Sequence, residues 1–93
     1  MIVLIKSAPD TADAMRGLAL ARDSAADLVL LQNGVLFAQK GRLADFAGAI
    51  HVLDDDKKLR GLRDDELDGR AKTIDYDFLT DLMVDCDKVV GMF

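Results

Sequence analysis

The segment Asp27-Leu-Val-Leu-Leu31 decides how the fold is read. Its four consecutive apolar residues, Leu28 to Leu31, leave no polar face, so both faces of a strand here must be covered by other parts of the chain. Strands covered on both faces are typical of parallel sheets, because the connections between parallel strands place helices on the two sides. Gln32-Asn-Gly34 then supplies turn residues that end the strand. The segment therefore predicts a central strand of a parallel sheet.

Apolar runs and helical patterns alternate on either side of this segment. Besides the central strand, strands are predicted over residues 2–5, 49–53, 71–75 and 88–93. Helices are predicted over residues 11–23, 54–60 and 76–86. Strands that alternate with helices through short connections predict a single domain over residues 1–93. Its fold class is α/β: a small three-layer domain with a mainly parallel sheet of about five strands.

The predicted helices have an inward and an outward face. Asp10 is the expected cap of the first helix, and its core-facing residues are predicted to be Ala12, Met15, Leu18 and Ala19. In the last helix, three aspartates lie opposite an apolar stripe made of Phe78, Leu79, Leu82, Met83 and Cys86. The strand over residues 71–75 is less apolar than the others, and we expect it nearer an edge of the sheet.

The composition excludes several classes of protein. The 93 residues carry a net charge of −5, so direct binding to nucleic acid is not expected. One Cys and one His make neither a disulfide framework nor a four-ligand zinc site. The glycines form no nucleotide-binding motif, and we predict no metal and no cofactor. Apolar runs are too short for a membrane span and no secretion signal is expected, which favours a cytoplasmic protein.

Cys86 is the only thiol and the one candidate for catalysis by sulfur. A Cys on the apolar stripe of a helix is usually a small buried hydrophobe. Its place at the C-terminal end of the helix, between Asp85 and Asp87, disfavours the thiolate that a reactive Cys needs. We therefore expect a structural role for Cys86, and catalysis by Cys86 is the alternative.

Three adjacent carboxylates follow the predicted strand over residues 49–53, at the end where open α/β sheets bind ligands. Asp54, Asp55 and Asp56 would supply oxygen ligands to Mg²⁺. Acidic residues are also favoured in the first turn of a helix, because they complement its dipole. We expect this structural role, with a small-ligand site as the alternative.

Two other groups of polar residues have ordinary explanations. His51 lies in the middle of a predicted strand without a second His or a nearby nucleophile, so we expect a hydrogen-bonded or partner-contacting histidine. A local basic cluster comprises Lys57, Lys58, Arg60, Arg63 and Arg70. We expect a solvated loop face there, with contact to an acidic partner as the alternative.

Apolar residues between the second and third strands predict contact with another subunit. Val35, Leu36 and Phe37 follow a turn, and Leu43 and Phe46 lie in irregular chain. Apolar side chains at such positions expose a patch unless a neighbouring chain covers them. We predict a homo- or hetero-oligomer whose interface, within residues 32–46, includes Gln32, Asn33, Gly34, Val35, Phe37 and Phe46.

Segments spread over nearly the whole chain resemble, in order and spacing, the motifs of one known family. Leu28-Val-Leu-Leu-Gln-Asn-Gly-Val-Leu-Phe-Ala38 resembles the family segment LLLLQDGV-x-A-A. Val52-Leu-Asp-Asp-Asp-Lys-Lys-Leu-Arg-Gly-Leu62 resembles L-x-x-D-L-x-A-R-G-L. Thr73-Ile-Asp-Tyr-Asp-Phe-Leu-Thr-Asp-Leu82 resembles x-I-D-Y-x-x-F-V-x-L, with one residue fewer before the Phe. The opening Leu4-Ile-Lys6-Ser7-Ala8-Pro9 is similar to L-H-x-S-P without its His. Together these segments resemble the TusB/DsrH family of sulfur-relay proteins.

The resemblance implies a DsrEFH-type fold and a place in a persulfide relay. TusB-like chains assemble with TusC-like and TusD-like subunits in a relay toward 2-thiolation of the tRNA wobble uridine, and the DsrE/DsrF branch serves sulfur oxidation. The sulfur-carrying Cys of such systems belongs chiefly to the TusD/DsrE-like subunit. Some DsrH-like chains carry a Cys in the first helix, where residues 11–23 have none. Others have one near the end of the last helix, where Cys86 lies.

The leading hypothesis is a non-catalytic subunit of a cytoplasmic sulfur-relay complex that supports 2-thiolation of the tRNA wobble uridine. This chain would cover and position the persulfide Cys of a partner subunit. The first alternative is a sulfurtransferase or sulfur carrier that uses Cys86. The second is a stand-alone homo-oligomeric module that binds a small ligand near Asp54 to Asp56. Neither nucleic acid nor a membrane is an expected direct partner.

Overall fold

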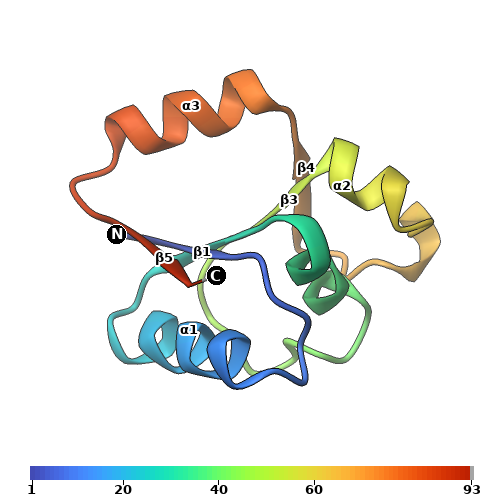
Figure 1. Ribbon diagram of the computed structural model, residues 1–93, viewed down its shortest axis with the longest axis horizontal. Helices are drawn as coiled ribbons and strands as arrows, with labels where there is room; N and C mark the ends of the chain where they lie inside the picture. The colour runs from blue at the N-terminus through green and yellow to red at the C-terminus, as the bar shows by residue number, and fades with distance from the viewer. Residues whose placement is uncertain (93) are drawn as a thin grey trace.

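The computed structural model describes residues 1–92 and contains one five-stranded sheet (Figure 1). The strands are β1 (Ile2–Ile5), β2 (Asp27–Leu30), β3 (Ile50–Leu53), β4 (Ala71–Ile74) and β5 (Val89–Met92). They lie in the order β4-β3-β2-β1-β5, and every neighbouring pair is parallel. The predicted α/β class with a mainly parallel sheet is confirmed, and β4 is an edge strand as expected. Phe93, the last residue of the predicted closing strand, lies outside the described residues.

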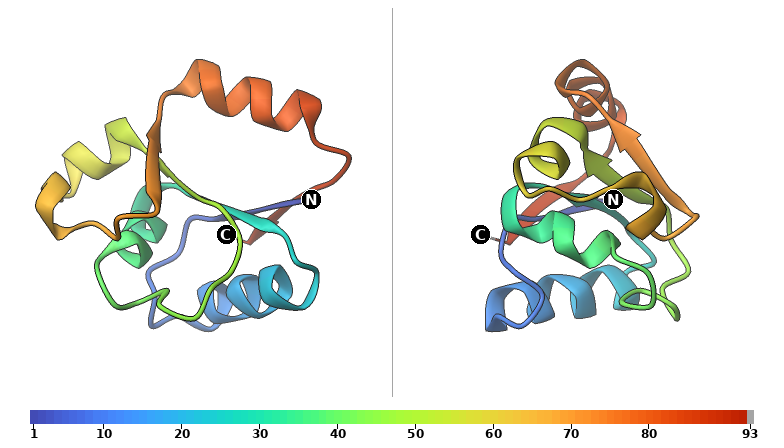
Figure 2. Two further views of the ribbon diagram at one scale, coloured as in Figure 1. Left: turned by 180° about the vertical axis from the view of Figure 1, so that it is seen from behind. Right: turned by 90° about the vertical axis from the view of Figure 1, so that its right-hand side faces the viewer.

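Helices cover both faces of the sheet. They are α1 (Ala12–Asp23), α2 (Asp54–Leu59) and α3 (Tyr76–Asp85), with short 3₁₀ helices η1 (Gln32–Ala38) and η2 (Asp64–Glu66). Crossover connections are right-handed, so connections that run in opposite directions along a sheet place their helices on opposite faces. The β1-to-β2 connection and the β4-to-β5 connection run in opposite directions, and α1 and α3 accordingly lie below and above the sheet (Figures 1 and 2). None of the helices in residues 1–92 has the length and apolar character to cross a membrane.

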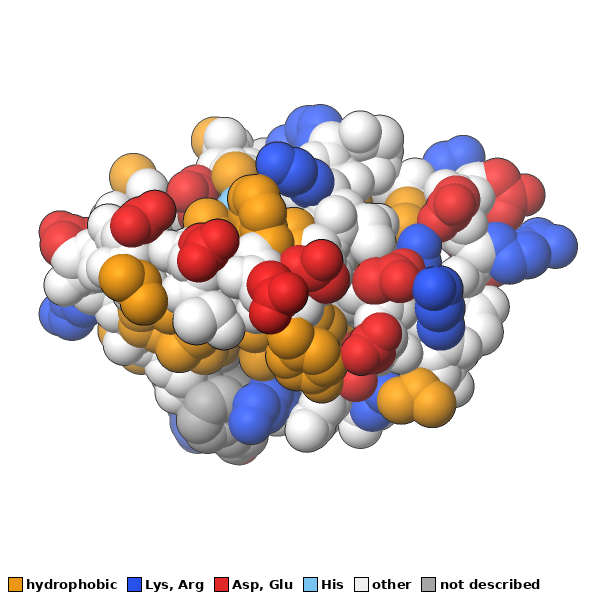
Figure 3. All heavy atoms as spheres, turned by 90° about the horizontal axis from the view of Figure 1, so that it is seen from above, with side chains coloured by type: hydrophobic (Ala, Val, Ile, Leu, Met, Phe, Trp, Pro, Cys, Tyr) orange, Lys and Arg blue, Asp and Glu red, His pale blue; other side chains and the backbone are white. Residues whose placement is uncertain are grey.

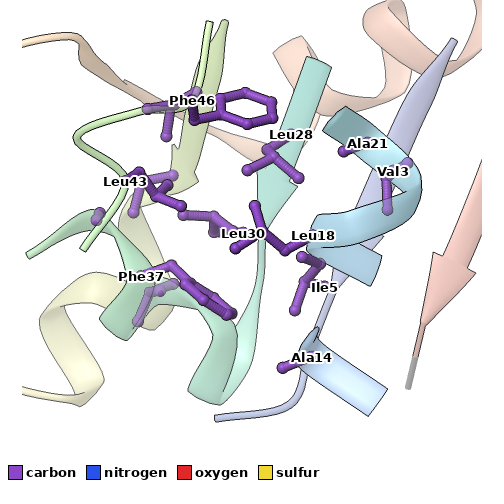
Figure 4. Close-up of a cluster of buried hydrophobic side chains, with 14 of the residues drawn as sticks. Val3, Ile5, Ala14, Leu18, Ala21, Leu28, Leu30, Phe37, Leu43 and Phe46 are labelled. Atoms are coloured by element: carbon purple, nitrogen blue, oxygen red, sulfur yellow. The ribbon is translucent and has the colours of Figure 1, made fainter. Parts of the chain in front are cut away.

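The larger part of the core lies on the α1 side of the sheet. Alternate residues of the central strands, such as Val3, Ile5, Leu28 and Leu30, point into it (Figure 4). The residues between them in the sequence, such as Val29, belong to a smaller apolar cluster under α3. Both clusters bury the strand residues almost completely, which explains why β1 and β2 are apolar at every position from Ile2 to Ile5 and from Leu28 to Leu30.

The buried face of α1 differs from the predicted one. Its buried residues are Ala14, Gly17, Leu18 and Ala21, and Ala12, Met15 and Ala19 are exposed. Small side chains allow the helix to approach the sheet closely, so a face made of Ala and Gly is buried although it is less apolar than the face that carries Met15. The predicted cap was also wrong by one residue: Thr11, not Asp10, accepts the hydrogen bond from the Ala14 N–H, at 3.2 Å.

The apolar residues between β2 and β3 are buried in the chain's own core. Val35, Phe37, Leu43 and Phe46 are at most 3% exposed, so the expectation of an exposed apolar patch was wrong. A short 3₁₀ helix and turns stand here in place of the long helix that usually connects parallel strands. Their apolar side chains fill the space beside α1 that such a helix would have filled (Figure 4).

Helix α3 covers the other face with only part of its predicted stripe. Leu79 is buried, and Leu82 and Cys86 are half-buried against the smaller cluster. Phe78 and Met83, which the pattern also placed in the core, are exposed. The prediction for α3 was therefore right for the middle of the stripe and wrong for its flanks.

Candidate functional site

The turn that follows β2 is built into the carboxyl edge of the sheet. Gln32 has a φ of +48°, in the left-handed region. The Gly34 N–H donates hydrogen bonds to the carbonyls of Leu31, at 2.8 Å, and Lys6, at 3.2 Å. A Cβ on Gly34 would lie 2.0 Å from the Ile5 carbonyl oxygen, so only glycine fits at this position. The turn is thereby held against the end of β1.

Side chains of α2 hold the same turn from the other side. Asp56 is buried, and its Oδ2 accepts a hydrogen bond from the Gln32 N–H at 2.7 Å. Arg60 Nε donates to Asn33 Oδ1 at 3.0 Å, and the Arg60 guanidinium lies 3.8 Å from Asp56. The structure therefore brings together three of the predicted site residues, Gln32, Asn33 and Gly34, and leaves the first two exposed.

Sequence reasoning did not identify Asp56 and Arg60 as supports of this turn. Asp56 lies in α2 and Arg60 caps its C-terminal end, so the two side chains, four residues apart, lie on the same side of the helix. The helix follows β3, the neighbour of β2, and the carboxyl ends of parallel neighbours meet at one edge of the sheet. The four-residue spacing of Asp56 and Arg60 and the adjacency of β2 and β3 would together have predicted this contact. The adjacency of the two strands, however, is known only from the fold.

The three carboxylates after β3 do not converge on one point. Asp54 pairs with Lys58 at 2.8 Å, and this contact lowers the pKa of Asp54 and raises that of Lys58. Asp56 points to the turn, and Asp55 is exposed. Within residues 1–92, no three His, Cys, Asp or Glu side chains are placed to hold a metal ion. The expected structural role of the run fits these contacts.

An open groove of about 620 Å³ does lie beside Asp54, at the carboxyl ends of β3 and β4. Its charged lining consists of Asp54, Lys57, Asp64, Asp68 and Asp75. The Lys57 side chain is 8% exposed, and its ammonium lies 2.5 Å from Asp64 and 3.6 Å from Asp54. The groove has the location expected for a small-ligand site, but Lys57, Asp54 and Asp64 pair with one another, Asp68 pairs with Arg70, and Asp75 caps α3.

The predicted basic cluster is divided among ion pairs within the chain. Arg63 pairs with Asp65 and Glu66. Arg70 instead holds the segment before β3, because its guanidinium donates to the carbonyls of Leu43 and Phe46. The same guanidinium and the Arg70 N–H lower the pKa of Asp68. This anchoring role was missed, since backbone carbonyls leave no signal in the sequence.

His51 and Cys86 have ordinary surroundings. His51 Nδ1 lies 3.2 Å from the Leu28 carbonyl oxygen, and its ring lies 6.3 Å from that of Phe78. A satisfied histidine was expected. Cys86 caps the C-terminal end of α3, where its Sγ donates to the Lys88 carbonyl at 3.1 Å and lies 3.9 Å from an Asp87 carboxylate oxygen. The Met1 ammonium, which is paired with Asp87 at 3.3 Å, also contacts the Cys86 side chain, and Cys86 is half-buried.

The fold and these contacts define a small three-layer α/β protein with an all-parallel sheet and a turn braced at its carboxyl edge. The family model described as DsrH-like protein matches residues 6–89, and the chain therefore belongs to the DsrH-like family. The crystal structure of the YchN protein from E. coli is similar, with a TM-score of 0.80 and 17% identity over 97% of each chain. This likeness confirms the DsrEFH-type fold. Comparison with curated proteins found no match.

The family membership confirms the resemblance noted in the sequence. DsrH-like proteins are related to sulfur relays, and they generally work in complexes with DsrE- and DsrF-like subunits. Two of the segments that carried the resemblance meet at the braced turn. One supplies Gln32 and Asn33, and the other supplies Asp56 and Arg60.

Proposed function

We propose that the chain is a non-catalytic subunit of a cytoplasmic sulfur-relay complex that supports 2-thiolation of the tRNA wobble uridine. The observation that carries the proposal is the match of the DsrH-like family model over residues 6–89. The chain would cover and position the persulfide of a DsrE- or TusD-like partner, and the sulfur would stay on the partner's thiol until it is passed on.

The surroundings of Cys86 support an accessory role. A thiol becomes a nucleophile when neighbouring positive charge stabilises the thiolate. Cys86 stands between Asp85 and Asp87, caps the C-terminal end of α3, and donates its thiol hydrogen to the Lys88 carbonyl at 3.1 Å. The Met1 ammonium also contacts Cys86, but it is paired with the Asp87 carboxylate at 3.3 Å. The proposed carrier is therefore a Cys of the partner.

The braced turn is the proposed contact with that partner. Asp56 holds the Gln32 backbone and Arg60 holds the Asn33 side chain, so binding at these exposed residues would need no further ordering of the turn's backbone. The neighbouring Val35, Phe37 and Phe46 support this interface from within the core. The proposed contact surface is therefore a rigid polar turn and not an exposed apolar patch.

The experiment combines the chain with the DsrE/TusD-like and DsrF/TusC-like subunits encoded in the same genome. We expect co-elution in size-exclusion chromatography. We also expect that omission of the chain lowers 2-thiouridine in tRNA, as measured by mass spectrometry of nucleosides. A strict monomer in the presence of both subunits, or unchanged tRNA thiolation without the chain, would contradict the proposal.

Persulfide loading separates this role from that of a carrier. The half-exposed position of Cys86 is the observation that favours a carrier. After treatment with a persulfide donor, we expect no stable adduct on Cys86, and a Cys86→Ser variant should support full relay activity. A stable adduct together with an inactive Cys86→Ser variant would assign the carrier role to this thiol.

A further inference from the structure

Helix α3 is apolar on two sides. Its inner side packs on the sheet through Leu79, Leu82 and Cys86. Its outer side carries a second group of apolar side chains, which are 56% exposed at Tyr76, 40% at Met83 and 77% at Val84. A helix that serves only to cover a sheet presents polar side chains to water. The outer side of α3 therefore has more apolar surface than its structural role requires.

Carboxylates lie beside this apolar surface in a regular row. Residues four apart are neighbours on a helix, so Asp77, Asp81 and Asp85 form one ridge. Tyr76 and Val84 lie eight residues apart in the adjacent i, i+4 row, and Met83 lies in the row beyond it. We call these six residues the outer face of α3. Figure 3 looks down on this helix and shows acidic atoms in a row over it, with apolar atoms alongside.

The charge of the outer face determines what could cover it. There is no Lys or Arg in α3. The Lys72 ammonium lies 4.5 Å from the centre of the ring of Phe78, which neighbours the carboxylate row on the side away from Tyr76 and Val84. The chain carries a net charge of −5. Two copies that met through this face would bring their carboxylate ridges together, and like charges across an interface are repulsive. Charge therefore disfavours a second copy and favours a basic partner.

The cations near α2 and η2 do not offer the complement. Lys58 pairs with Asp54, and Arg63 pairs with Asp65 and Glu66, so the cations near α2 and η2 are compensated within the chain. A partner helix could contact the apolar side chains of the outer face and its carboxylates at the same time, because side-chain ridges of one helix pack between those of another. Such a partner must supply both apolar side chains and uncompensated positive charge.

We propose that the outer face of α3 is a docking surface for a partner protein that presents an amphipathic helix with Lys or Arg beside its apolar strip. Tyr76, Met83 and Val84 bury apolar area against the strip, and the three aspartates pair with its cations. The proposal holds whether or not the partner is a sulfur-relay subunit, so its test is independent of relay activity.

The probe is a fluorescein-labelled synthetic helix of Leu and Lys, with Leu at i, i+3, i+4 and i+7 and Lys elsewhere. We expect saturable binding in fluorescence anisotropy, weakened by salt. Changing Asp77, Asp81 and Asp85 to Asn should weaken binding about tenfold or more. The matched control changes the exposed Asp10, Asp23 and Asp55 to Asn, alters the net charge equally, and should bind like the wild type within about twofold.

The apolar part of the outer face is tested with a second pair of variants. Val84→Ser is expected to weaken binding about tenfold, whereas Leu59→Ser on α2 should not, although Leu59 is 78% exposed and Val84 is 77% exposed. All these positions are exposed, so unchanged thermal unfolding will show that the variants are folded. Absence of binding by the wild type, equal losses in test and control variants, or self-association through α3 in sedimentation would overturn the proposal.

Discussion

Single residues determine whether the turn after β2 can form. Gly34 packs directly on the Ile5 carbonyl, and Gln32 holds a left-handed φ that costs free energy in a residue with a side chain. The Asp56 carboxylate offsets that cost, because it accepts the Gln32 N–H in a buried environment. The site therefore depends on a steric requirement at one residue and on a hydrogen bond at another, and each can be tested by substitution.

Gly34→Ala should destabilise the protein by about 1–3 kcal/mol, because the added Cβ would overlap the Ile5 carbonyl oxygen. Gly69→Ala is the matched control, since a Cβ there meets nothing within 4 Å. We expect the control to be neutral or more stable by up to about 1 kcal/mol. Urea denaturation followed by circular dichroism measures both, and equal stability of the two variants would refute the close contact.

Asp56→Ala should lower the free energy of unfolding by about 1–3 kcal/mol, because the Gln32 N–H loses its acceptor. Asp55→Ala, an exposed neighbour in the same helix, should change it by less than about 0.5 kcal/mol. Asp56→Asn keeps a side-chain oxygen and should fall between the two. Amide hydrogen exchange at Gln32 provides a local measurement, and unchanged protection in Asp56→Ala would contradict the assignment.

At the scale of elements, the two faces of the sheet are covered in different ways. On the α1 side, the helix and the segment between β2 and β3 bury large side chains such as Leu43 and Phe46. On the other side, α3 buries only Leu79 fully. Arg70 joins two elements, since it ties the segment before β3 to the start of β4 through backbone carbonyls. Stability should therefore be unevenly distributed along the chain.

The packing of α3 predicts a sharp contrast within one helix. Leu79→Ala should cost about 2–4 kcal/mol, because it leaves a cavity in the smaller apolar cluster. Val84→Ala should change stability by less than about 0.5 kcal/mol, since Val84 is largely exposed. Chemical denaturation of both variants checks this contrast, and a large loss for Val84→Ala would show that the outer face of α3 is already covered.

At the scale of the whole molecule, the paired carboxylates predict how stability depends on pH. Arg70 lowers the pKa of Asp68, and Lys58 lowers that of Asp54, from the ordinary value of 3.8. A carboxyl whose pKa is lower in the folded state stabilises the protein above its unfolded pKa and loses this effect as the pH falls through the folded pKa. Stability should therefore be steady near neutral pH and decrease below about pH 4.

Urea midpoints measured from neutral to acidic pH will test this dependence. The Asp68→Asn variant should lose less stability than the wild type over the acidic range, since it no longer takes up a proton at this position. Asp10→Asn, which changes an exposed carboxyl just before α1, serves as the control, and its stability should follow the wild-type curve. Parallel curves for Asp68→Asn and the wild type would contradict the role of the Asp68–Arg70 pair.

Much of the architecture could be predicted from local patterns. The apolar runs at Ile2–Ile5 and Leu28–Leu30 and the helical composition of Ala12–Asp23 are properties of contiguous residues, and they were sufficient for the α/β class. The turn residues Gln32, Asn33 and Gly34 were also located correctly. Their interface role stays a prediction, because nothing observed so far tests it.

The sequence by itself determined the order of the strands and helices and, through its motifs, the DsrH-like family. Only the tertiary structure decided that Val35 and Phe46 are buried, that Asp56 braces Gln32 from 24 residues away, and that one side of α3 faces water. The physical reason is that periodicity shows which side chains avoid water but not which surface covers them. That choice depends on volume and on contacts between residues far apart in the chain.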